Sequence, residues 1–79
     1  MQIKIKLFGP ARERAGVESI ELEVPAPVRL DHIHDLMNET YPVLKGMAGR
    51  WAVNLEFVPG DTTLRSGDEL AWIPPVSGG

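Results

Sequence analysis

The sequence predicts a small α+β domain in which a mixed β-sheet carries one main helix on one face. Extended stretches occur in pairs before and after residues 30–41, whereas the apolar residues inside that segment recur every three or four positions. The chain has 79 residues, of which 43% are hydrophobic, so it is long enough for one domain with a modest core. The predicted element order is β-β-α-β-β.

The first two strands are predicted from strict alternation. Residues 1–8 place Ile3, Ile5 and Leu7 on one face and polar side chains on the other. Gly9-Pro10 ends this strand, and we expect the polar stretch through residue 16 to turn the chain. Residues 19–24 alternate in the same way, which predicts the hairpin partner of the first strand.

The helix is predicted over residues 30–41, where Leu30, Ile33 and Met37 share one face. Arg29 occupies the capping position, so Asp31 is the nearest good acceptor for the first amides of the helix. Pro42 disfavours helical geometry at the residue before it and ends the helix. Residues 43–49 are predicted to form a loop, with room for a single helical turn.

Two more strands are predicted over residues 51–57 and 69–73, with turns at 59–61 and 66–68. Two hairpins and one helix on so short a chain favour a sheet whose first and last strands lie parallel at its centre, with the helix packed diagonally across one face. This is the β-grasp, or ubiquitin-like, arrangement. Residues 1–75 are the predicted β-grasp domain, and residues 76–79 are a predicted flexible tail that ends in Gly-Gly.

Composition argues against several classes of function. The net charge is −3 with no basic stripe, so we expect no nucleic-acid partner. No apolar run approaches the length that spans a bilayer, so we expect no membrane association and a cytoplasmic protein. The chain has no cysteine, and therefore no disulfide and no thiolate nucleophile or ligand.

The polar residues offer no catalytic or metal-binding set. His32 and His34 are two positions apart on the predicted helix and point in different directions, which argues against a shared metal. The acidic residues of the helix are expected to form its solvated face, and Asp68 is expected to build a turn. We therefore expect no enzymatic activity from this chain on its own, and no bound cofactor.

Four aromatic side chains are informative, namely Phe8, Trp51, Phe57 and Trp72. Alternation places Phe8 on the face opposite Leu7, and Trp72 opposite its neighbours in the last strand. A sheet covered by one helix leaves its other face open, and aromatic residues on that open face indicate a surface that binds a partner.

The stretch Pro74-Pro75-Val76-Ser77-Gly78-Gly79 is the most informative segment. The prolines extend the chain away from the domain, and the glycines let another protein's backbone approach closely. Such a tail can enter a narrow pocket with its carboxylate first. The reactive group is therefore expected to be the C-terminal carboxylate of Gly79.

These residues resemble the small subunit of molybdopterin synthase, a ubiquitin-like sulfur carrier of the ThiS family. The resemblance covers the whole chain. It rests on Phe-Gly-Pro-Ala-Arg-Glu at residues 8–13, on Val-Asn at 53–54, and on the segment from Leu64 through Gly-Asp-Glu at 67–69 to the final Gly-Gly.

The resemblance implies a sulfur carrier. An E1-like adenylating enzyme would use ATP to adenylate Gly79. Gly78, which precedes it and has no side chain, would let the partner approach closely. Sulfur from a persulfide donor would displace AMP and leave a thiocarboxylate. The large subunit would use this sulfur to convert cyclic pyranopterin monophosphate into the dithiolene of molybdopterin, in a heterotetramer built on a large-subunit dimer.

The resemblance also implies which residues meet these partners. They are an apolar patch and a nearby basic residue, followed by the base of the tail: Phe8, Phe57 and Ile73, then Arg12, then Pro74, Pro75 and Val76. The sequence leaves alternatives open. These are a sulfur carrier for thiamine, cysteine or tRNA thiolation, a modifier joined to lysines through Gly79, or a binding domain with an inert tail.

Overall fold

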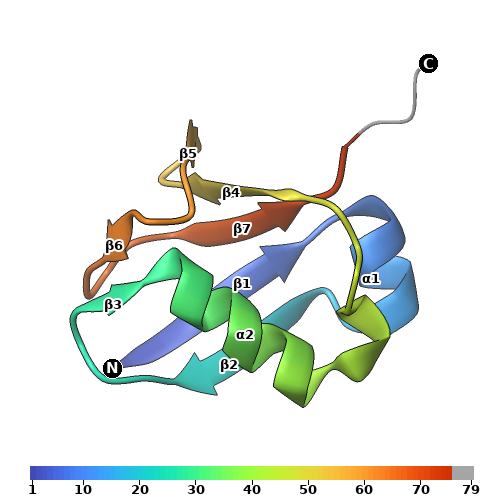
Figure 1. Cartoon of the computed structure of the whole chain (residues 1–79), viewed down its shortest axis with the longest axis horizontal. Coiled ribbons are helices and arrows are strands. Elements are labelled where there is room, and N and C mark those ends of the chain that lie inside the picture. Colours follow the sequence, from blue (N-terminus) through green and yellow to red (C-terminus); the bar gives the residue numbers. More distant parts are fainter. Residues whose placement is uncertain (76–79) are drawn as a thin grey trace.

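The computed structural model describes residues 1–75, and the main sheet within them has five strands in the order β2-β1-β7-β4-β5 (Figure 1). The strand bounds are β1 Gln2–Leu7, β2 Ser19–Glu23, β4 Arg50–Val53, β5 Glu56–Val58 and β7 Leu70–Ile73. β1 and β7 run parallel at the centre, with Ile5 opposite Leu70 and Leu7 opposite Trp72. The other neighbouring strands in this sheet are antiparallel. The predicted β-grasp arrangement is confirmed.

Helix α2, Leu30–Thr40, covers one face of the sheet (Figure 1). The predicted apolar face is confirmed, because Leu30, Ile33 and Met37 are completely buried. These side chains join the alternating residues of β1 in one core, together with Ile20, Leu44 and Leu64. The acidic residues predicted for the solvated face of the helix are exposed, namely Asp31, Asp35 and Glu39.

The start of α2 is capped differently from the prediction. The Asp31 side chain accepts no amide hydrogen of the helix and instead lies 2.6 Å from the Arg29 guanidinium. Backbone carbonyls from another part of the chain satisfy the first amides, since Leu30 N donates to Thr62 O and Asp31 N donates to Gly60 O. The predicted cap was wrong because the carbonyl groups that accept these amide hydrogens lie about thirty residues further along the chain.

The connection between β1 and β2 contains a helix, where the sequence predicted a turn. Helix α1 spans Gly9–Ala15, with Pro10 in its first turn and Gly16 in the left-handed conformation at its end. Both residues mark helix ends, proline at the start and glycine just past the last turn. Only Ala11 of this helix is buried, so the apolar periodicity that reveals longer helices is missing.

The predicted third strand is in fact two strands. β4 and β5 form a tight hairpin through Asn54 and Leu55, whose φ angles are 51° and 69°. Two successive positive φ angles are typical of the two-residue turns that join antiparallel strands. Asn54 tolerates this conformation, but leucine rarely adopts it, so the sequence did not indicate a turn here.

Two short strands form a second sheet, which was not predicted from the sequence. β3, Val28–Arg29, pairs with β6, Thr63–Leu64, and brings the chain before α2 beside the segment that caps this helix. A 3₁₀ turn, η1 at Pro42–Leu44, is the single helical turn allowed for after α2. Neither α-helix within residues 1–75 has the length and apolar composition that a membrane crossing requires.

Candidate functional site: the open face of the sheet

The face of the sheet opposite α2 carries an apolar hollow. Phe8 and Phe57 line it, with 43% and 51% of their surfaces exposed, and Ile73 lies half-buried beside them. We call Phe8, Phe57 and Ile73 the outer patch. Two alanines, two leucines and two charged residues complete the lining of this hollow: Ala52, Ala71, Leu55, Leu70, Lys6 and Glu69. The structure therefore brings together the three apolar residues that the sequence analysis assigned to partner binding.

Phe8 reaches this face because it continues the alternation of β1. Its backbone is still extended, with φ −134° and ψ 154°, and it serves as the residue before the first turn of α1. Leu7 therefore points into the core, where it is 2% exposed, and Phe8 points outward. The predicted orientation of Phe8 is confirmed.

Arg50 extends the outer patch with a positive charge. Its guanidinium carbon lies 4.1 Å from the centre of the Phe57 ring, a cation–π contact. Arg50 is the first residue of β4 and lies opposite Ile73 of β7. The sequence analysis did not single out Arg50, because its stacking depends on the β4–β5 hairpin that the sequence did not reveal.

The tail leaves the domain beside this patch. β7 ends at Ile73, after which Pro74 is buried and Pro75 is exposed. The rigid pair therefore begins inside the domain and ends in solvent. Val76, Gly78 and Gly79, which the sequence analysis assigned to the tail, lie outside the described residues.

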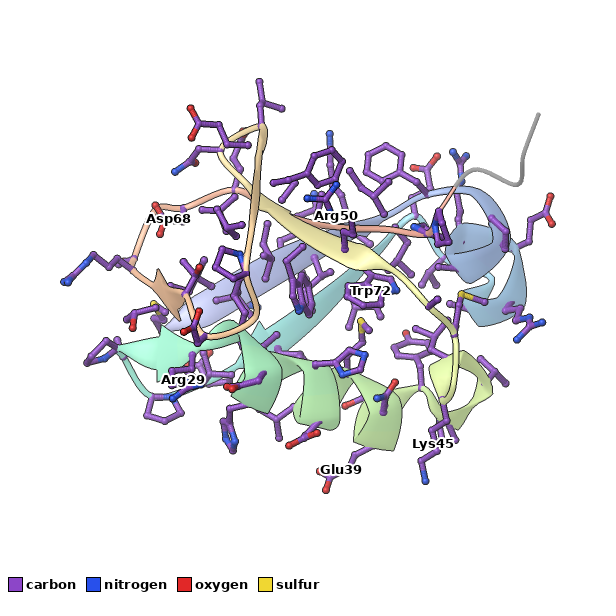
Figure 2. All side chains as sticks on the ribbon, turned by 45° about the horizontal axis from the view of Figure 1, so that its top comes forward. Arg29, Glu39, Lys45, Arg50, Asp68 and Trp72 are labelled. Carbon is purple, nitrogen blue, oxygen red and sulfur yellow. The ribbon has the colours of Figure 1, made fainter. Side chains whose placement is uncertain are left out.

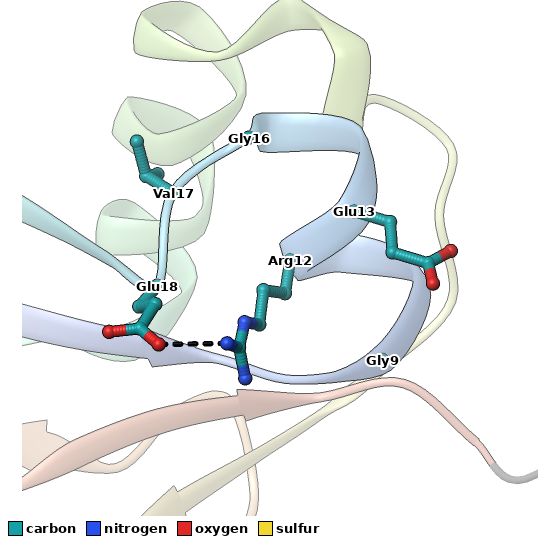
Figure 3. A pocket seen from close by; sticks show the side chains of 6 residues that line it. All are labelled: Gly9, Arg12, Glu13, Gly16, Val17 and Glu18. Atoms are coloured by element: carbon teal, nitrogen blue, oxygen red, sulfur yellow. Dashed lines mark hydrogen bonds and ion pairs between the residues drawn. The ribbon is translucent and has the colours of Figure 1, made fainter.

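Arg12 lies at the edge of this region, on α1. Its guanidinium is 2.7 Å from the carboxylate of Glu18, as the dashed line in Figure 3 shows. The two side chains line an open polar hollow with Gly9, Glu13, Gly16 and Val17. A second small hollow joins Arg12 to Phe8 and Lys6. Arg12 thus neighbours the outer patch, but within residues 1–75 its charge is already paired with Glu18.

The two tryptophans lie on the other face, toward α2. Trp51 and Trp72 are each 5% exposed, and their ring centres are 4.8 Å apart. His34 of α2 packs against them, 4.9 Å from Trp72. Figure 2 shows Arg50 and Trp72 on opposite sides of the sheet, Trp72 toward the helix. Alternation correctly placed Trp72 opposite its neighbours, and its role is to fill the core.

Asn54 and Asp68 join two turns at the far end of the sheet. The Asn54 side-chain amide donates to Asp68 Oδ1 over 3.0 Å and its oxygen accepts the Glu69 amide, while Asp68 Oδ2 accepts the Arg65 amide. The Arg65 amide and then the Asn54 side chain favour the ionised form and lower the pKa of Asp68. The turn-building role predicted for Asp68 is confirmed.

The histidines do not form a site together. His32 is exposed on α2, whereas His34 packs on the tryptophans. Within residues 1–75 there is no group of three side chains among His, Asp and Glu placed to hold a metal ion. The features that this face presents are an apolar hollow, a guanidinium next to the Phe57 ring and the proline pair that follows β7.

Comparison with known proteins identifies the family. A model of the ThiS family matches residues 5–79. The chain belongs to the ThiS family. A relative from Pyrenophora tritici-repentis is 41% identical over 95% of this chain and 87% of its own length, and one from Arabidopsis thaliana is 33% identical over 100% and 84%. Both are named molybdopterin synthase sulfur carrier subunit, so the resemblance seen in the motifs is confirmed.

Solved structures share the fold of this ThiS-family chain over its full length. SAMP1 from Haloferax volcanii is 26% identical, with a TM-score of 0.88 and complete coverage of both chains. A chain in the complex of subunits 1 and 2 of molybdopterin-converting factor from Helicobacter pylori is 24% identical, with a TM-score of 0.72 and complete coverage of both chains. The second likeness shows the fold alone.

Proposed function

We propose that this ThiS-family protein is the sulfur carrier subunit of molybdopterin synthase. The observation that carries the proposal is that the family match runs through Pro-Pro-Val-Ser-Gly-Gly to residue 79, in a chain whose relatives bear that name over nearly their whole length. Because those relatives are named as one subunit of the enzyme, a larger subunit is the expected partner.

In this function Gly79 carries the sulfur. A carboxylate becomes a useful electrophile only when one of its oxygens becomes a good leaving group, which adenylation by an ATP-using activating enzyme supplies. Sulfur from a persulfide donor then displaces AMP, and cleavage of the donor's sulfur–sulfur bond by a thiol leaves the thiocarboxylate. The carrier binds no cofactor of its own in this scheme, since ATP belongs to the activating enzyme.

The domain would present the tail rather than carry out the chemistry. The outer patch offers an exposed apolar anchor beside the exit of β7, and the rigid proline pair sets the direction in which the chain leaves. Any four-residue segment spans at most about 14 Å when extended. The reacting atoms of each partner would therefore lie within this distance of Pro75.

Intact mass spectrometry tests the proposal. The purified chain is incubated with ATP, the activating enzyme and a persulfide donor from the same cell, next to a variant that lacks Gly79. We expect the mass to rise by the difference between sulfur and oxygen in the wild-type chain only. Subsequent incubation with the large subunit and cyclic pyranopterin monophosphate should return the carrier to its original mass and yield molybdopterin.

A second candidate function is a protein modifier, which is favoured by the likeness to SAMP1, a small archaeal modifier protein. A modifier would join Gly79 to lysine side chains of other proteins. Covalent adducts on lysine, in place of a released thiocarboxylate chain, would support this function. A thiocarboxylate that forms but gives no molybdopterin would instead indicate a carrier for another sulfur-transfer pathway.

A further inference from the structure

Arg50 lies on the open face beside Phe57, and none of the ion pairs among residues 1–75 includes it. It is exposed, and its guanidinium carbon lies 4.1 Å from the centre of the Phe57 ring. Resting on the proposed function, we propose that Arg50 is a specificity-determining residue. Its guanidinium binds a carboxylate side chain on the large subunit when the outer patch docks.

Two other arginines have a carboxylate partner inside the domain, whereas Arg50 has none among residues 1–75. Arg12 lies 2.7 Å from Glu18 and Arg29 lies 2.6 Å from Asp31, so each has a carboxylate within the domain. Among residues 1–75, no acidic side chain lies within ion-pair distance of Arg50. Within the described residues the Arg50 guanidinium also donates no hydrogen bond, so its N–H groups are available to a partner.

Stacking also prepares Arg50 for binding. A guanidinium held over an aromatic ring has fewer conformations to lose when it binds, and its planar edge matches both oxygens of a carboxylate. Burial of Phe57 under a partner would remove water from the same contact and strengthen it. Arginine is one of the three residue types enriched among the side chains that dominate binding energy at protein interfaces.

The charge around the hollow indicates an acidic group on the partner. The chain as a whole carries a net charge of −3. The charged residues that line the hollow are Lys6 and a single acidic residue, Glu69, and Arg50 lies over Phe57, which also lines it. A partner surface that complements this region is therefore apolar with a carboxylate opposite Arg50. Since Arg50 is paired with Ile73, this contact lies at the end of the sheet from which the tail leaves and would fix its direction.

Binding of the large subunit to Arg50 variants tests the inference. Affinities are measured by calorimetry at low and high salt for wild type, Arg50→Met, Arg50→Lys and Arg50→Glu. Arg65→Met is the matched control, since Arg65 is exposed near the opposite end of β7. Melting curves and circular dichroism confirm that each variant is folded.

We expect Arg50→Met to weaken binding about tenfold or more and to flatten its salt dependence, because that loss corresponds to one charged anchor of the interface. Arg50→Lys should be intermediate, since lysine keeps the charge without the planar edge, and Arg50→Glu should bind weakest. Arg65→Met should bind as wild type does.

Two results would overturn the inference in distinguishable ways. If Arg50→Met binds as tightly as wild type, or loses no more affinity than Arg65→Met, Arg50 does not contact a carboxylate of the large subunit. The proposed function as a sulfur carrier is unaffected by that result. Wild-type chain that forms its thiocarboxylate but does not bind the large subunit contradicts the proposed function, and the inference about Arg50 falls with it.

Discussion

Substitution of Gly49 by alanine tests how tightly the tryptophan core is packed. A Cβ atom at Gly49 would lie 2.4 Å from Cε2, 2.5 Å from Cζ2 and 2.8 Å from Nε1 of Trp72. Carbon atoms in contact are normally about 3.5–4.0 Å apart, so the indole ring would have to move by about 1 Å. The ring has little room to move, because Trp51 and His34 pack against it at 4.8 and 4.9 Å between ring centres.

The expected cost follows from this overlap. Additional methyl groups in a packed core typically destabilise by about 1–3 kcal/mol. For a domain of this size, about 2 kcal/mol corresponds to a fall of about 8–16 °C in melting temperature. Glycine to alanine at an unstrained position without such a clash is expected to stabilise instead, by about 0.4–1 kcal/mol, because alanine restricts the unfolded chain. The sign of the effect is therefore diagnostic.

A double-mutant cycle isolates the contact. Chemical denaturation is measured for wild type, Gly49→Ala, Trp72→Phe and the double variant, with Gly60→Ala as the control because a Cβ there meets nothing within 4 Å. Phenylalanine lacks the part of the indole that the new Cβ would strike. We expect Gly49→Ala to be neutral or stabilising in the Trp72→Phe background, which gives a coupling energy of about 1–3 kcal/mol. A cost that is the same in both backgrounds would refute the packing argument.

Three further predictions concern the turns and the outer patch. Leu55→Gly should raise the free energy of unfolding by about 0.5–1 kcal/mol, because Leu55 is 93% exposed and held at φ 69°, where glycine is unstrained; a loss of stability in urea would contradict this. Hydrogen bonds lower the pKa of Asp68 below its ordinary value of 3.8, so the stability that the ionised carboxylate contributes is present at neutral pH and is lost as the pH falls through the lowered pKa. The free energy of unfolding of Asp68→Asn should therefore fall less on acidification than that of wild type. Identical dependence on pH in the two proteins would contradict this prediction. Phe8→Ala should weaken binding of the large subunit by about 1–3 kcal/mol in calorimetry while the domain remains folded. Unchanged affinity would contradict the role of Phe8 in binding, and loss of the folded domain would make Phe8 a core residue instead.

The elements that the sequence predicted are those in which apolar residues recur at a regular, short spacing along the chain. Alternation along β1 and the three-to-four spacing of Leu30, Ile33 and Met37 each report which side of an element is buried, and the structure buries those side chains. The same alternation predicted that Phe8 points outward. These predictions succeeded because burial on one face imposes a periodic pattern on the residues themselves.

The elements that the sequence did not predict have few buried residues of their own. Helix α1 buries only Ala11, and the turn at Asn54 and Leu55 replaces the usual glycine with leucine. The amide of Asp31 is satisfied by the Gly60 carbonyl, far away in the chain. The turn at Asn54 and the start of α2 are held in place by contacts with other segments, which no local pattern of residues records. The proline and glycine at the ends of α1 are local signals, but no apolar periodicity accompanies them.

Some features of the candidate site likewise follow from the sequence, and others follow only from the tertiary structure. By itself the sequence determined the open face of the sheet and the outward direction of Phe8, because these depend on residue type and on alternation. The tertiary structure alone decided that Phe8, Phe57 and Ile73 line one hollow, and that Arg50 stacks on Phe57 beside the exit of β7. The physical reason is that strands β1, β5, β7 and β4 meet at this face only after the sheet has assembled in its β2-β1-β7-β4-β5 order.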